Sequence, residues 1–118
     1  MQQYDQFSVV LLERSLTAPK LDAKTSRSIR DEHLNRIAQL HESGQLLAAG
    51  PTVTGSDETL EAFGILTVDR HRAEQIFWQD PLVKAGIWKF KIVSWTVPKG
   101  AINYAHVSFP KSLQEAGM

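Results

Sequence analysis

Apolar residues gather in four short segments of the chain. One amphipathic stretch lies between the first and second segments, and another lies between the third and fourth. The apolar segments are "FSVVLL" (residues 7–12), "QLLAAG" (45–50), "AFGILTV" (62–68) and "IWKFKIVSWTV" (87–97). Their continuous or alternating apolar character and β-branched residues are typical of strands. Residues 27–43 and 69–79 instead space their apolar side chains three or four positions apart, which predicts α-helices.

Helix-capping and turn-forming residues mark where these elements begin and end. Thr25 or Ser26 is available to cap the first helix, Asp69 can cap the second, and Gly44 ends the first. We interpret "DPLVKAG" (80–86) as a turn before the last strand. The predicted order is β-α-β-β-α-β, which indicates an α+β fold of ferredoxin-like type: a four-stranded antiparallel sheet with both helices on one face.

The last predicted strand is apolar on both sides. Its side chains fall into two sets that point to opposite faces of the sheet: Trp88, Phe90 and Ile92, then Val93, Trp95 and Val97. Because the helices cover only one face, we expect a homodimer in which two sheets pack together. The alternative is that the segment after Val97 folds back over the open face.

The first predicted helix carries Arg30 and His33 on its apolar side. With about 100° of rotation per residue, measured from Ile29, His33 lies near 40°, Ile37 near 80° and Arg30 near 100°. A charged group on a core-facing surface is costly unless it is paired or opens onto a cavity. The two residues therefore indicate a pocket between helix and sheet. The alternative is a hydrogen-bonded core histidine beside an arginine that extends to solvent.

Asp80, in the turn after the second helix, is the candidate partner of His33. A carboxylate beside an imidazole fixes its tautomer and supports general acid–base chemistry. An Asp before Pro also commonly starts a turn, and spacing alone does not bring the two side chains together. Of the other histidines, we expect His41 at the helix end to be partly exposed or to interact with the C-terminal helix dipole, and His71 and His106 to lie on the surface.

Composition narrows the class of protein further. The 118 residues suit one domain, and 13 basic residues balance 13 acidic ones, so no charge excess favours nucleic acid or an anionic membrane as partner. There is no cysteine, the histidines lack zinc-ligand spacing, and no glycine-rich phosphate loop is present, so we expect no metal and no cofactor. No segment approaches the roughly 20 apolar residues of a membrane helix. With no signal-peptide pattern either, we expect a cytoplasmic protein without a membrane partner.

Three motifs in order resemble the YCII-related (YciI-like) family. They are "VVLL" in the first strand, "IRDEHLNRIAQLHESGQLLAAGP" at 29–51 and "WQDPLVKAGIW" at 78–88. The resemblance covers roughly residues 7–97. It implies a dimeric α/β barrel built from ferredoxin-like domains, with residues 1–98 as the domain and 99–118 as a C-terminal extension.

The resemblance also implies an active centre made of His33 and Asp80, with Arg30 as a substrate-binding residue. The family includes a dehydrochlorinase of chlorinated hydroxyquinols, and its wider fold relatives include muconolactone isomerase. We therefore expect a small cofactor-independent enzyme of lyase or isomerase type. It would perform acid–base chemistry on a small, cyclic or carbonyl-bearing compound. One alternative is a non-catalytic ligand-binding or accessory dimer. A haem-dependent member of the same barrel superfamily is the weakest alternative, because the chain has no motif that matches such proteins.

Two segments depart from the family pattern. The loop "TVTGSDETLE" (52–61) matches no motif, and we expect it to border the pocket. The tail after residue 98 contains Tyr104, Val107 and Phe109, which we expect either to join a dimer contact or to cover a pocket. A partly ordered terminus is the remaining alternative.

Overall fold

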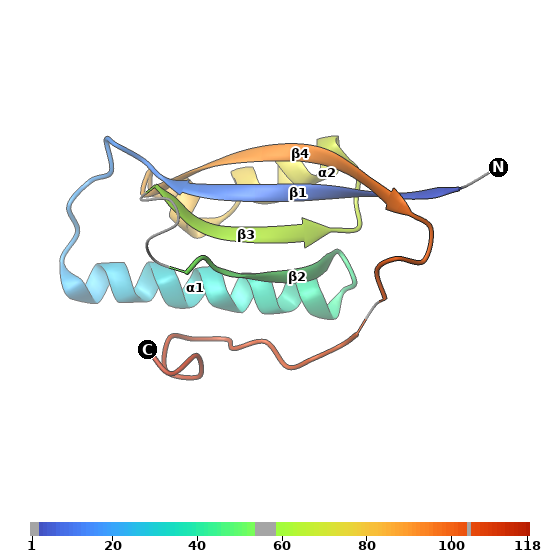
Figure 1. Ribbon diagram of the computed structural model, residues 1–118. Coiled ribbons are helices and arrows are strands. Elements are labelled where there is room, and N and C mark those ends of the chain that lie inside the picture. The colour runs from blue at the N-terminus through green and yellow to red at the C-terminus, as the bar shows by residue number, and fades with distance from the viewer. Residues whose placement is uncertain (1–2, 54–58, 104) are drawn as a thin grey trace.

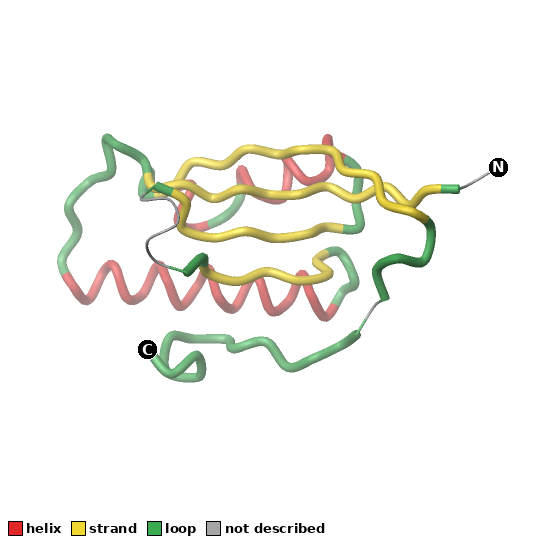
Figure 2. The backbone as a smooth tube through the Cα atoms, viewed as in Figure 1, coloured by secondary structure: helices red, strands yellow, loops and turns green. Residues whose placement is uncertain are grey.

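The structure is a computed structural model that describes residues 3–53, 59–103 and 105–118. One antiparallel sheet in the order β2-β3-β1-β4 contains β1 (Tyr4–Arg14), β2 (Leu46–Pro51), β3 (Leu60–Leu66) and β4 (Trp88–Pro98). The helices α1 (Ala23–Glu42), α2 (Arg70–Trp78) and the one-turn α3 (Pro81–Lys84) lie on one face of it (Figures 1 and 2). The predicted α+β, ferredoxin-like arrangement is confirmed.

The pairing of the central strand β1 decides which side chains face the helices. Val10 lies opposite Gly64 of β3 and Ile92 of β4, whereas Val9 lies opposite Ile65 and Val93. Val10 and Ile92 belong to the core beneath the helices. Because successive side chains alternate, Val9 and its neighbours form the opposite, open face of the sheet.

Two predicted boundaries are wrong, each because an aspartate caps a helix. The first helix begins at Ala23, not near residue 27, since the Asp22 carboxylate accepts the Thr25 backbone N–H at 2.6 Å. Neither Thr25 nor Ser26 is its cap. The turn expected at 80–86 contains the helix α3, with Asp80 as its N-cap and Pro81 as its first residue.

The C-terminal tail runs beside α1 rather than over the open face of the sheet (Figure 1). The alternative in which it folds back over the sheet is therefore wrong. Phe63, Val93 and Trp95 remain 41%, 40% and 39% exposed on the open face. The homodimer stays a prediction, and Tyr104 lies outside the described residues.

Candidate functional site

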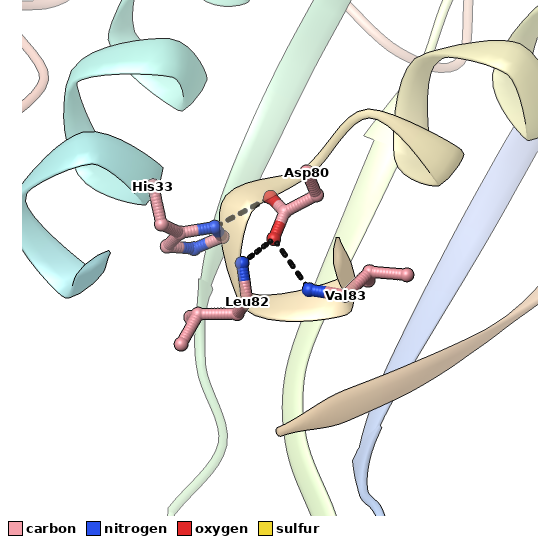
Figure 3. A network of polar contacts seen from close by, with 4 residues as sticks. All are labelled: His33, Asp80, Leu82 and Val83. Atoms are coloured by element: carbon pink, nitrogen blue, oxygen red, sulfur yellow. Dashed lines mark hydrogen bonds and ion pairs between the residues drawn. The ribbon is translucent and has the colours of Figure 1, made fainter. Parts of the chain in front are cut away.

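His33 lies on the sheet-facing side of α1 and is 7% exposed. Its ring nitrogen Nδ1 is 2.6 Å from the Asp80 Oδ2 atom, although the two residues are 47 positions apart in sequence. Figure 3 shows the imidazole projecting from α1 toward the turn between α2 and α3. The fold therefore brings together the two candidate residues whose distance the sequence left open.

Asp80 is fully buried and is held by backbone amides on one side. Its Oδ1 atom accepts the N–H groups of Leu82 at 2.9 Å and Val83 at 3.3 Å, which leaves Oδ2 directed at His33 (Figure 3). The turn-forming and histidine-pairing interpretations of Asp80 are thus both correct. One carboxylate oxygen caps α3, and the rigid turn orients the other.

This pairing determines the tautomer of His33. A carboxylate that accepts hydrogen bonds requires the proton on the imidazole Nδ1, so the neutral ring carries its lone pair on Nε2. Within residues 3–53, 59–103 and 105–118, Nε2 makes no hydrogen bond to the protein. Trp88 packs edge-on against the imidazole, with ring centroids 5.0 Å apart at 79°. The ring is therefore held from two sides while Nε2 stays available.

A cavity of about 230 Å³ opens between α1 and the sheet beside this ring. Arg30 and His33 line it from α1, and Glu61 lines it from β3. The rest of the wall is mainly apolar and aromatic, including Phe77 and Trp88. The prediction that Arg30 and His33 face a pocket is borne out geometrically. Pro51 and Glu61 also line this cavity, but residues 54–58 of the expected bordering loop lie outside the described part of the chain.

Arg36, one turn after His33 on α1, adds positive charge next to the pair. Burial lowers the pKa of its guanidinium, the nearby Asp80 carboxylate opposes that lowering, and Arg72 adds to it. Its Nη1 atom is buried and has no hydrogen-bond partner among the described residues. The carboxylate of Asp80 thus has a guanidinium neighbour as well as the imidazole.

The expected partial exposure of His41 is wrong, although it does lie in the last turn of α1. It is 3% exposed, its Nδ1 atom contacts the Leu46 carbonyl oxygen at 2.9 Å, and its Nε2 atom accepts the Val107 N–H at 3.2 Å. The tail covers it, a long-range contact that no local pattern signals. His71 and His106 are exposed as expected. Sequence reasoning also missed the role of Trp88 beside His33, which it treated only as a sheet residue.

Comparison with known proteins places the chain in a family. A family model described as the YCII-related domain matches residues 10–96. The chain belongs to the YCII-related family. The match spans β4 almost to its end and includes Arg30, His33 and Asp80. No curated protein sequence matches the chain.

Two solved structures are similar to this member of the YCII-related family. One is 5-chloro-2-hydroxyhydroquinone dehydrochlorinase from Burkholderia phenoliruptrix AC1100 in complex with 2,5-dihydroxybenzoquinone, at 23% identity and a TM-score of 0.44, covering 74% of this chain and 92% of that one. The other is a dimeric protein of unknown function and ferredoxin-like fold from Bacteroides fragilis, at 9% identity and a TM-score of 0.46. That match covers 82% of this chain and 100% of the other.

The described residues contain neither a membrane-spanning helix nor a cluster of metal-binding side chains. None of their helices combines the length and apolar character needed to cross a bilayer. Nor do three His, Cys, Asp or Glu side chains gather there as a metal site would require.

Proposed function

We propose that this protein is a small enzyme of lyase or isomerase type that uses His33 and Asp80 for acid–base chemistry without a cofactor. The observation that carries the proposal is the 2.6 Å contact between His33 Nδ1 and Asp80 Oδ2 beside a cavity lined by Arg30. A buried, oriented imidazole whose second nitrogen is free meets the geometric requirement for a general base.

In the proposed reaction, His33 Nε2 removes a proton from a C–H or O–H group of the substrate. The ring becomes imidazolium, and the Asp80 carboxylate stabilises that charge. Arg30 binds the anionic or carbonyl oxygen on which negative charge develops. Return of the proton to another carbon gives an isomerisation, whereas departure of a leaving group gives an elimination.

The cavity favours a small compound. A volume of about 230 Å³ with mostly apolar and aromatic walls fits a ring of roughly six to ten heavy atoms. Arg30, His33 and Glu61 are the charged or titratable residues of its lining. Because Arg30 can bind an oxygen that carries negative charge, a cyclic compound with a carbonyl, phenolate or carboxylate group is the proposed substrate class.

We also propose that the protein acts as a homodimer that covers the open face of the sheet. Phe63, Val93 and Trp95 are each about two-fifths exposed there, and Trp95 packs on Phe7 with ring centroids 6.2 Å apart. Such a contiguous apolar surface is unusual on a monomer. A second copy of the same face would bury it symmetrically.

Turnover by matched variants tests the proposal. The purified protein would be incubated with small cyclic ketones, phenols and their halogenated forms, and conversion followed by NMR. His33→Ala should abolish conversion, and Arg30→Ala should mainly raise KM for anionic compounds. His71→Ala changes an exposed histidine and is the control. Conversion that survives in His33→Ala would contradict the assignment and favour a non-catalytic ligand-binding dimer.

A further inference from the structure

The C-terminal tail contributes a wall to the His33 cavity. Besides helix and strand residues, the cavity is lined by five tail residues: Phe109, Pro110, Leu113, Ala116 and Met118. All five are apolar, and they follow the family match, which ends at residue 96. The cavity therefore combines the shared domain with a segment beyond the matched region.

His41 anchors this wall without lining the cavity. Its Nε2 atom accepts the Val107 N–H at 3.2 Å, and its ring stacks on Phe109 with centroids 4.0 Å apart at 11°. Its Nδ1–H donates to the Leu46 carbonyl at 2.9 Å, so the neutral imidazole links β2 to the tail. One buried histidine thus fixes the position of the aromatic ring at the start of the wall.

A second hydrogen bond holds the tail further along the chain, at Leu113. The Asp31 carboxylate on α1 accepts the Leu113 N–H at 2.8 Å. Lys111 and Glu42 add an ion pair at 3.7 Å, but both side chains are more than half exposed, so it contributes little. Phe109 and Leu113 are therefore tail residues of the cavity wall that contacts with α1 hold in place.

We propose that Phe109 and Leu113 determine the size of ligand that reaches His33, and that His41 and Asp31 are positioning residues for them. The proposal rests on the proposed function in one respect, that the ligand occupies the cavity beside His33. The tail contributes one wall of the cavity, and apolar side chains there exclude larger rings by steric overlap. Members of the family with another tail would then accept other ligands.

The first test needs no ligand. Diethyl pyrocarbonate acylates accessible neutral imidazoles, and mass spectrometry of a digest gives the rate at His33 relative to exposed His71. Phe109→Ala and His41→Ala should each raise that ratio about three- to tenfold, because loss of the ring stack opens the wall. His41→Gln, which keeps an acceptor for the Val107 amide, should raise it less. Val107→Ala, an exposed tail residue, should leave it unchanged.

The second test measures size preference with benzoate and 2-naphthoate as probes, by following backbone NMR shifts of the full chain. Phe109→Ala should move the ratio of their Kd values about tenfold or more toward the naphthoate. Thermal melts establish that each variant remains folded. If folded Phe109→Ala shows the wild-type acylation rate at His33 and the wild-type ratio of Kd values, the proposal that Phe109 limits ligand size is wrong. If the variants are acylated faster at His33 but the wild type binds neither benzoate nor 2-naphthoate, the tail does limit access to His33. The proposed ligand chemistry is then wrong.

Discussion

Replacing Asp80 by Asn or by Ala separates its two structural tasks. Asp80 Oδ1 caps α3 by accepting two backbone N–H groups, while Oδ2 accepts the proton on His33 Nδ1. Asp80→Asn retains a carbonyl oxygen for the cap but presents an amide N–H to the imidazole. Asp80→Ala removes both acceptors and leaves buried donors without partners.

The magnitudes follow from this count of acceptors. Loss of an N-cap costs about 0.5–2 kcal/mol, and a buried unsatisfied donor costs about 1–3 kcal/mol. Asp80→Ala should therefore lower the free energy of unfolding by about 2–4 kcal/mol. Asp80→Asn should cost about 1 kcal/mol or less, because the imidazole can exchange tautomers and accept the new N–H at Nδ1. In that tautomer Nε2 carries the proton and is no longer a base.

Urea denaturation followed by circular dichroism gives the two stability changes, and long-range ¹H–¹⁵N NMR of the imidazole gives the tautomer. We expect Asp80→Asn to be nearly as stable as wild type, to carry the His33 proton on Nε2, and to be inactive. Equal stability losses in the two variants, or an unchanged Nδ1–H tautomer in Asp80→Asn, would refute the reasoning.

Three other substitutions test the fold and the assembly. Trp95→Asp should convert a dimer of about twice the 13.2 kDa chain mass into a monomer in light scattering, and a monomeric wild type would sink the sheet-to-sheet dimer. Hydrogen bonds from Thr25 lower the pKa of Asp22, so the cap is fully effective above the ordinary value of 3.8 and is lost as the pH falls through the lowered pKa. Melts of Asp22→Ala and wild type should differ near neutral pH and converge in acid; divergence in acid would contradict the cap. A Cβ at Gly64 would lie 3.1 Å from a Val10 methyl carbon, so Gly64→Ala should cost about 1–3 kcal/mol in urea titrations, and an unchanged midpoint would argue against this packing.

The sequence predicted the elements because each depends on local periodicity. Alternation in 87–97 and three-to-four spacing in 27–43 were enough to place β4 and α1, although capping by Asp22 moved the start of α1. Arg30 and His33 were found for the same reason, since polar residues on an apolar helix face stand out in a single stretch. The position of Asp80 in the turn after the second helix made it a candidate partner of His33, and the resemblance implied the pair.

Long-range contacts could not be predicted from these patterns. The 2.6 Å approach of Asp80 to His33 depends on how α3 sits against α1, and the burial of His41 depends on the course of a tail more than 60 residues away. Trp88 satisfied the strand pattern, which concealed its contact with the imidazole. Local patterns report which face a residue occupies, whereas the partner on the other side of that face comes from the tertiary fold.

Stability changes in His33→Ala do not by themselves identify its role. The substitution leaves the buried Asp80 Oδ2 atom without its partner, so a loss of about 1–3 kcal/mol is expected whether His33 is catalytic or only structural. An experiment that identifies the role of His33 must therefore measure proton transfer to or from a substrate.

The most direct measurement is exchange of substrate protons with solvent. Small cyclic carbonyl and phenolic compounds that bind the cavity, as judged by NMR shifts of residues around His33, would be incubated with the protein in D₂O and their C–H signals followed. The account predicts that wild-type protein speeds loss of a C–H signal from at least one bound compound, while folded His33→Ala and Asp80→Asn do not. Equal exchange in wild type and His33→Ala, or binding without exchange of any bound compound, would contradict an acid–base role for His33.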